Sequence, residues 1–249
     1  HFPTVSFPNP EEPGALDEAL QLAVDVGADV ILANDPDTDR LAVALPRAGT
    51  WRTLTGNQIG LVLADFALSH TDVSSPMVIN SIVSSPMLGD IAAHHGARFA
   101  QTLTGFKWIW NAALDLEAAG PDRFVFGYEE ALGYCVGPAV RDKDGISAAV
   151  LFADLIAAAL GEGTDVWGRL DALYRRHGLW VSTQKSVVRP GTEGAAVIAG
   201  ALTRFGESTP ERLGGHTGVG ATGFRRGAEV GPRCLPAASL VVLARGGAG

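Results

Sequence analysis

Hydrophobic and polar positions follow two patterns along most of the chain. Short apolar runs predict buried strands, and apolar residues that recur every three or four positions predict helices. This alternation of strands and helices is typical of βαβ units, in which a sheet is covered on both faces. Strands are expected over residues 30–33, 41–45, 77–82, 98–101 and 124–128, and helices over 16–24, 57–69, 87–95, 107–119 and 145–160. Gly27 is placed to end the first of these helices, and Asn57 is placed to cap the second.

The pattern weakens after about residue 190. A helix is expected over 195–205, whereas residues 213–236 are dense in glycine and have no apolar period. Such a composition indicates a linker or an interrupted domain. A last strand is expected over 239–243, and we expect it to lack strand partners and to leave an unpaired edge.

Composition narrows the class of protein. The 249 residues are 47% hydrophobic and 18% charged, which is typical of a globular fold. A net charge of −8 argues against nucleic acid or an anionic membrane as the main partner, although a local cationic pocket can still bind a phosphorylated small molecule. Two cysteines give no disulfide framework, and no apolar run approaches the ~20 residues of a membrane span, so we expect a cytoplasmic protein. The chain begins at His1 without a signal-peptide pattern, and we expect it to be part of a longer polypeptide.

The most informative segment follows the first predicted strand. Asp35, Asp37 and Asp39 stand at positions i, i+2 and i+4, and Arg40 comes directly after them. In an extended or gently curved loop this spacing directs alternate carboxylates to one side. Neighbouring carboxylates repel one another unless a cation lies among them, and oxygen-only ligands favour Mg²⁺. A metal beside a guanidinium makes a natural phosphate site.

Three other interpretations of this segment compete with a metal site. An EF-hand loop that starts at Asp35 requires glycine and glutamate where Arg40 and Pro46 stand. A haloacid-dehalogenase-like phosphatase requires threonine or valine at the fifth position, where Asp39 or Leu41 stands. A solvated acidic turn stays open on spacing alone.

Two further loops carry candidate chemistry. Gly105 permits close backbone approach, Thr104 is placed to cap the next helix, and Lys107 opposes the helix dipole unless an anion pairs with it. A phosphate is one such anion, and a solvated lysine is the alternative. Glu129 and Glu130 should point to opposite sides of an extended loop, so that one faces a ligand and the other makes structural bonds. Carboxylates suit sugar hydroxyls, and a plain surface turn is the alternative.

The segment before the alanine-rich helix adds positive charge. Asp142 and Asp144 are suited to capping that helix, so a structural role alone explains them. Arg141 and Lys143 are candidate phosphate donors at a helix N-terminus.

In order and spacing, these segments resemble the α-D-phosphohexomutases, the phosphoglucomutase and phosphomannomutase superfamily. Residues 35–40 fit its metal-loop pattern Asp-x-Asp-x-Asp-Arg without a mismatch. Residues 102–109 resemble its Thr-Gly-x-Lys turn, 127–133 its sugar-binding Glu-Glu-Ser-Gly loop and 141–145 its Lys-Asp-Gly segment. The resemblance extends to about residue 190.

The resemblance implies an α/β fold made of two consecutive mixed-sheet α/β domains of phosphohexomutase type and an incomplete C-terminal segment. Residues 1–73 would be domain II with the metal loop, and 74–190 domain III with the sugar loop. Residues 191–249 would be a linker and the start of domain IV. The implied enzyme is a Mg²⁺-dependent isomerase that moves phosphate within a sugar through a phosphoserine and a bisphosphorylated sugar.

The resemblance also assigns roles to individual residues. Asp35, Asp37 and Asp39 would bind Mg²⁺, and Arg40 and Lys107 would act in catalysis. Substrate binding would fall to Thr104, Gly105, Glu129, Glu130, Arg141 and Lys143. The expected partners are a small phosphosugar and the missing N-terminal and C-terminal domains of the same chain, with neither nucleic acid nor membrane.

Three departures limit what the resemblance implies. Ala131 replaces a serine found in many hexomutases, and the loop around it looks more like the phosphopentomutase and glucose-1,6-bisphosphate synthase branch. The Thr-x-Ser-His-Asn-Pro phosphoserine loop and the Arg-x-Ser-Gly-Thr-Glu-Pro phosphate loop do not occur in this sequence. We therefore expect this chain alone to bind Mg²⁺ weakly and to turn over little or nothing.

Several functions stay open on the sequence. We favour a phosphoglucomutase, with phosphopentomutase and phosphomannomutase as alternatives. A non-catalytic module that binds a sugar phosphate or a metal is the alternative from another class. A Mg²⁺-dependent phosphatase is disfavoured because its nucleophile signature is missing.

Overall fold

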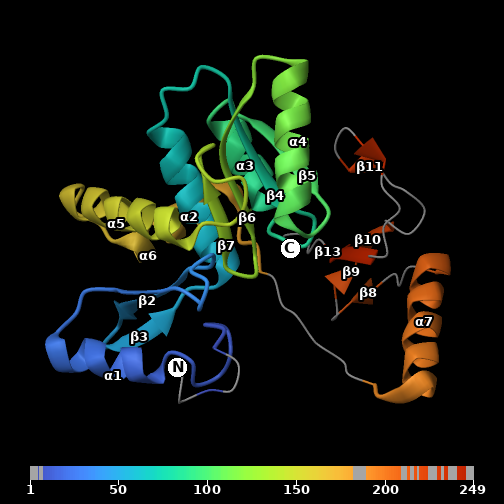
Figure 1. Cartoon of the computed structure of the whole chain (residues 1–249), viewed down its shortest axis with the longest axis horizontal. Helices are drawn as coiled ribbons and strands as arrows, with labels where there is room; N and C mark the ends of the chain where they lie inside the picture. Colours follow the sequence, from blue (N-terminus) through green and yellow to red (C-terminus); the bar gives the residue numbers. More distant parts are fainter. Residues whose placement is uncertain are drawn as a thin grey trace. The chain divides into compact units, whose positions relative to one another are not determined.

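The computed structural model describes residues 5, 8–181 and 189–208, together with short strands between 212 and 244. The chain divides into two compact units, His1–Trp180 and Val181–Gly249 (Figure 1). The candidate site residues all belong to the first unit.

The first unit begins with a small antiparallel sheet. It contains β1 (Ile31–Ala33), β2 (Ala42–Arg47) and β3 (Thr50–Thr53), in that order. Helix α1 (Asp17–Val26) packs on it through Ala23, which lies in one apolar cluster with Ile31 and Ala44. As expected, α1 ends at Gly27, whose φ of 65° is the left-handed conformation that glycine adopts without strain. Strand β3 was not predicted, because its residues are largely exposed and form no apolar run.

The second sheet has the order β5-β4-β6-β7. Strand β4 (Pro76–Ser81) is parallel to β5 (Arg98–Thr102) and to β6 (Arg123–Glu129), and β7 (Gly133–Val136) is antiparallel to β6. All six residues of β4 are buried, as expected for a parallel strand covered on both faces. The predicted α/β class with a mixed sheet is confirmed.

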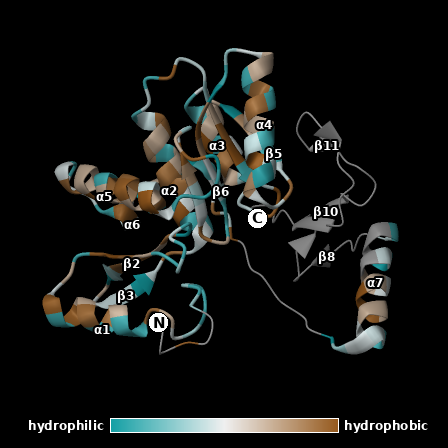
Figure 2. Cartoon of the chain, viewed as in Figure 1, coloured by the Kyte–Doolittle hydropathy of each residue, from teal (hydrophilic) through white to brown (hydrophobic). Residues whose placement is uncertain are grey.

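Helices cover both faces of this sheet. Helix α4 (Phe106–Ala119) packs on one face, where its apolar residues meet Met77 and Ile79 of β4. The opposite face, with Val78, packs against α2 (Gly56–Ser69), α3 (Met87–His94), α5 (Gly145–Gly161) and α6 (Val166–His177). Figure 2 shows that α5 is hydrophobic along most of its length. Among the described helices, none alone combines the length and apolar composition of a membrane span; α5 and α6 pass that test only jointly, across a bend of 87°.

One hydrophobic core joins the two sheets of the first unit. Leu41, Val43 and Leu45 beside and within β2 share a cluster with Phe152 of α5 and Leu170 of α6. The indole Nε1 of Trp167 on α6 also donates to the backbone oxygen of Pro46, at 3.0 Å. The loop between β1 and β2 is therefore fixed to the second sheet by packing on its C-terminal side.

Two predicted helix caps were wrong. Helix α2 is capped by Thr55 in a reciprocal pair with Gln58, and not by Asn57, whose side chain is buried and accepts from Ser85 N and Tyr128 Oη. Helix α4 begins after Gly105, which is its N-cap residue and has no side chain to cap with, so the cap position is not Thr104. The predicted cap of α5 by Asp144 is confirmed, since its carboxylate accepts from Ile146 N.

The second unit contains more strands than the sequence predicted. Helix α7 (Gly191–Glu207) is followed by β10 (Val219–Gly223), which pairs antiparallel with β13 (Leu240–Ala244). The expectation of an unpaired last strand was therefore wrong. Two-residue strand pairs also occur within the stretch expected to be a linker: β8 (Arg212–Leu213) with β9 (His216–Thr217), and β11 (Glu229–Val230) with β12 (Arg233–Cys234). Strands this short, with glycine in β10, leave no alternating pattern to detect.

Candidate metal and phosphate site

The loop that carries the three aspartates joins β1 to β2 as a compact turn. Thr38 N donates to Asp35 O at 3.0 Å, and Thr38 has a left-handed φ of 61°. Arg40 N donates to Asp35 Oδ1 at 3.0 Å, and Asn34 Nδ2 donates to Arg40 O at 2.6 Å. The loop is thus folded back on itself, and the expectation of an extended or gently curved loop was wrong.

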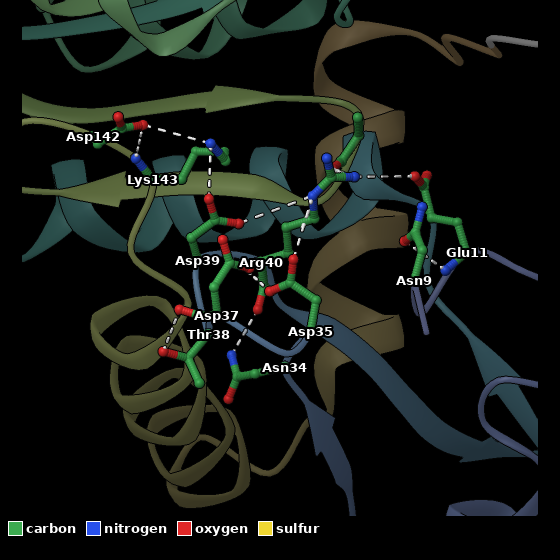
Figure 3. A network of polar contacts seen from close by, with 11 residues as sticks. Asn9, Glu11, Asn34, Asp35, Asp37, Thr38, Asp39, Arg40, Asp142 and Lys143 are labelled. Atoms are coloured by element: carbon green, nitrogen blue, oxygen red, sulfur yellow. Dashed lines mark hydrogen bonds and ion pairs between the residues drawn. The ribbon is translucent and has the colours of Figure 1, made fainter. Parts of the chain in front are cut away.

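The turn nevertheless brings the three carboxylates together (Figure 3). One oxygen from each of Asp35, Asp37 and Asp39 lies within 4.8 Å of the others. Burial raises the pKa of Asp35, and the neighbouring Asp39 and Asp37 carboxylates add to this, while the bond from Arg40 N opposes it. Three carboxylate oxygens this close together and accessible to solvent suit a hard divalent cation, so the donor set fits Mg²⁺.

Arg40 lies at the centre of the surrounding charges. Its Nε is 3.7 Å from Asp35 Oδ2 and 3.9 Å from Asp39 Oδ1, and its Nη1 is 3.9 Å from Glu11 Oε2. Nη1 also donates to Ala131 O at 3.3 Å. The guanidinium is about one-third exposed, at 31%, so it is held beside the carboxylates and still has donors that can meet an anion.

Lys143 approaches the same carboxylates from the segment before α5. Its Nζ lies 2.9 Å from Asp39 Oδ2 and 3.5 Å from Asp142 Oδ1. Burial by itself would lower the pKa of Lys143, but Asp39 and Asp142 outweigh it, and the pKa is raised. The ammonium is therefore held in its charged form beside residues 35–40, the expected metal loop.

The two adjacent glutamates at the end of β6 have different partners. Glu129 is buried, and its Oε1 accepts from Gly105 N at 2.6 Å, which joins this loop to the start of α4. Burial raises the pKa of Glu129, with opposing contributions from that bond and from the charges of Lys143 and Arg40. Glu130 Oε2 instead accepts from Ser84 Oγ at 2.9 Å and from Ser81 Oγ at 3.2 Å. As predicted, the two side chains leave the strand in different directions.

Three expected site residues lie at the surface. Thr104 and Lys107 are exposed, and Lys107 Nζ lies 5.0 Å from the ring centre of Trp108. Arg141 is also exposed, with its Cζ 6.0 Å from the ring centre of Trp110. Their predicted roles in catalysis or substrate binding stay predictions.

Backbone bonds join the metal loop to the two segments beside it. Arg40 and Gly133 form an isolated antiparallel bridge, and Leu41 N donates to Leu132 O at 3.0 Å. On the other side, Gly145 N donates to Thr38 O at 3.1 Å. The metal loop, the loop after β6 and the start of α5 therefore form one continuous structure.

Several residues around the site were not predicted. Glu11 pairs with Arg40, Asn34 closes the metal loop, and Ser81 and Ser84 bond to Glu130. Only the serines carried a usable signal, because Ser81 lies at the carboxyl end of a predicted strand and Ser84 just beyond it, where ligand loops gather. Nothing in the spacing of Glu11 or Asn34 indicates the tertiary contacts they make.

Comparison with known proteins shows the family to which the chain belongs. Residues 1–49 match the family model described as phosphoglucomutase/phosphomannomutase, alpha/beta/alpha domain II, and residues 55–176 match domain III. The chain is 44% identical over 188 residues to a Haemophilus influenzae protein named "Probable phosphomannomutase", covering 75% of this chain and 37% of that protein. It is 40% identical over 192 residues to the Mus musculus phosphopentomutase, covering 73% of this chain and 31% of the relative.

A solved structure agrees on the fold. The open form of parafusin, a phosphoglucomutase of Paramecium, superposes with a TM-score of 0.54 at 22% identity, over 69% of this chain and 30% of that one. This chain thus spans about a third of the length of these relatives. On the two matched family domains, the chain belongs to the phosphoglucomutase/phosphomannomutase family.

Proposed function

We propose that the first unit carries the metal-binding and sugar-binding part of a Mg²⁺-dependent phosphosugar mutase. The phosphorylated serine and the remaining phosphate-binding loop would come from further domains of the same protein. The observation that supports this most strongly is the convergence of Asp35, Asp37 and Asp39 beside Arg40 and Lys143.

Each group has a role that its position supports. The three aspartates would hold Mg²⁺, which when bound polarises a phosphoryl oxygen. Arg40, fixed beside the carboxylates, would donate hydrogen bonds to the phosphoryl oxygens and offset the charge that develops on them during transfer. Lys143 would bind a phosphate oxygen as a point charge.

Glu129 would orient the sugar. Its buried carboxylate lies at the start of α4 and close enough to Lys143 and Arg40 for their charges to affect its pKa. Bonds from a carboxylate to neighbouring hydroxyls would fix which sugar oxygen faces the metal loop. Lys107, Thr104, Gly105 and Arg141 would complete the binding of substrate phosphate.

The substrate is proposed to be a hexose phosphate, in a phosphoglucomutase reaction with a sugar bisphosphate as intermediate and activator. A pentose phosphate is the second candidate, because Ala131 replaces a hydroxyl-bearing serine and the loop resembles the phosphopentomutase branch. The match to a phosphopentomutase supports that candidate as well.

The proposal is tested by calorimetry on the 249-residue chain and by a substrate panel on the natural full-length protein. The chain should bind glucose 1,6-bisphosphate more tightly when Mg²⁺ is present, and Glu129→Ala should weaken that binding while preserving Mg²⁺ binding. The full-length protein should convert glucose 1-phosphate faster than ribose 1-phosphate or mannose 1-phosphate. The converse preference for ribose 1-phosphate would favour the second candidate, and a full-length protein that converts none of them would contradict the mutase proposal.

A further inference from the structure

Glu130 is held by two serines at the carboxyl end of β4. Ser84 Oγ donates to Glu130 Oε2 at 2.9 Å and accepts from Glu130 N at 3.0 Å. Ser81 Oγ lies 3.2 Å from the same carboxylate oxygen and 2.8 Å from Ser84 Oγ. Both serines are buried. The side chain and the backbone of residue 130 are thus fixed by a single group of hydroxyls.

Ser81 and Ser84 have two hydroxyl hydrogens for three contacts, one between the serines and one from each serine to Glu130 Oε2. A serine hydroxyl has one hydrogen to donate and two lone pairs to accept with. Ser84 gives its hydrogen to the carboxylate and accepts from Glu130 N. The single hydrogen of Ser81 then points either to Glu130 Oε2 or to the remaining lone pair of Ser84, and both positions hold Ser81 in the group. Bonds from a hydroxyl to a charged acceptor are about twice as strong as neutral ones. The arrangement therefore resists rotation of the Glu130 side chain.

A second contact, with the start of α2, fixes the backbone of Glu130. A Cβ on Gly56, the first residue of α2, would collide with the carbonyl group of Glu130. The backbone of Glu130 therefore lies directly against the start of α2, without room to shift toward it. Glu129 is its neighbour at the end of β6, so its direction follows from that of Glu130.

We propose that Glu130 is a positioning residue: Ser81 and Ser84 anchor it, and this anchor directs Glu129 to Gly105 and toward the hydroxyls of a phosphosugar. The second half of this statement rests on the proposed function, in which Glu129 binds the sugar. The first half, that the serines and Glu130 maintain the Glu129–Gly105 bond, stands on the contacts alone.

The anchor can be followed at the Gly105 amide in an ¹⁵N-labelled 249-residue chain. A short bond to a carboxylate moves an amide proton resonance downfield and slows its exchange with solvent. Glu130→Ala and the double variant Ser81→Ala/Ser84→Ala should shift the Gly105 resonance upfield and speed its exchange. Glu130→Gln should retain most of the wild-type signal, because its amide oxygen still accepts from both serines. Ser69→Ala, which removes a hydroxyl bonded within α2, is the matched control and should leave Gly105 unchanged.

Binding provides the second measurement. Glu130→Ala should weaken the binding of glucose 1,6-bisphosphate at least about tenfold, a loss of ~1.4 kcal/mol of binding free energy. Its affinity for Mg²⁺ should stay within about twofold of wild type. If Glu130→Ala or the double serine variant fails to fold, Ser84→Ala alone and Glu130→Gln carry the test. The proposal would be overturned if the Gly105 resonance did not move in folded Glu130→Ala or in the folded serine variants. It would also be overturned if folded Glu130→Gln lost the downfield shift of Gly105. A wild-type chain that binds no phosphosugar would instead contradict the proposed function, and the Gly105 measurement would still decide the anchor.

Discussion

Lys143 Nζ lies 2.9 Å from Asp39 Oδ2, so a lysine proposed to bind phosphate is paired with an aspartate proposed to bind metal. The lysine stem packs closely against the Gly133 backbone, since a Cβ added to Gly133 would lie only 2.6 Å from the Lys143 Cδ. The Lys143 Nζ also lies 5.8 Å from the ring centre of Phe106. The Lys143 ammonium now neutralises the charge of the Asp39 carboxylate. A divalent cation bound by Asp39 would neutralise that charge in its place. Metal binding and the freedom of Lys143 are therefore expected to be linked.

Removal of this ammonium should strengthen metal binding. Lys143→Met should raise the affinity for Mg²⁺ about twofold to fivefold, which is the scale of a partly exposed ion pair. Lys107→Met is the matched control, because that exposed lysine lies over Trp108 and should leave Mg²⁺ affinity unchanged. Calorimetric titration measures both. Equal or weaker binding in Lys143→Met would show that the lysine does not compete with the metal.

Gly145 should be essential to the metal loop. A Cβ at this position would collide with the backbone oxygen of Arg40 and with the Asn34 side chain, both of which shape the loop. Gly145→Ala should therefore cost about 1–3 kcal/mol of stability, as overpacking usually does, and should lower Mg²⁺ affinity. Urea unfolding and calorimetry measure the two effects.

Gly161 at the other end of α5 supplies the control for that experiment. Among the described residues, and apart from its chain neighbours and the backbone of α5 itself, no atom lies within 4 Å of the place a Cβ would occupy there. Gly161→Ala should leave Mg²⁺ affinity unchanged and should not destabilise the chain, since alanine is the better helix former. Similar effects of the two substitutions would indicate a general response of α5 and not a specific contact with the loop.

Glu129 should make stability depend on pH. Burial raises its pKa, so the folded chain binds this proton more tightly than the unfolded chain does. That contribution is fully present below the pKa of the unfolded state and is lost as the pH rises through the folded pKa. Glu129→Gln removes the buried charge and can still accept from Gly105 N. It should therefore gain stability relative to wild type at about pH 7.5, and the gain should fade toward about pH 4. A difference that urea unfolding finds constant over this range would refute the assignment.

The thiol of Cys135 should be unreactive in the folded chain. Its side chain is buried, its Sγ lies 3.1 Å from Val140 O, and burial raises its pKa to about 12. Since the thiolate is the nucleophile, iodoacetamide should leave the Cys135 peptide unmodified at about pH 8 and alkylate it after unfolding in urea. Mass spectrometry of that peptide reports both states. Fast labelling without urea would mean that β7 opens readily.

The predictable part of the fold rests on strong local patterns. The buried run of β4, the apolar period of α4 and the nearly continuous apolar, alanine-rich composition of α5 indicate those elements. Strands β3 and β10 were missed because their residues form no apolar run. The cap of α2 was misassigned because Asn57 is used in a tertiary contact with Tyr128 and Ser85 that spacing cannot indicate.

The candidate site shows the same division. The spacing of Asp35, Asp37 and Asp39 indicated a carboxylate cluster, and the structure brings them together. The reason differs, since a left-handed Thr38 and the side chain of Asn34 fold the loop into a turn. The bonds of Glu130 to Ser81 and Ser84 join residues 46 or more positions apart, and no local pattern carries such a contact.

The central claim is that the three aspartates form a Mg²⁺ site, and calorimetric titration of Mg²⁺ into the 249-residue chain tests it most directly. Wild type should bind one Mg²⁺ per chain. Asp37→Asn, which changes the most exposed member of the cluster, should weaken binding at least about tenfold while the chain stays folded. Equal Mg²⁺ affinity in the two proteins, or the absence of any saturable Mg²⁺ binding by wild type, would contradict the account.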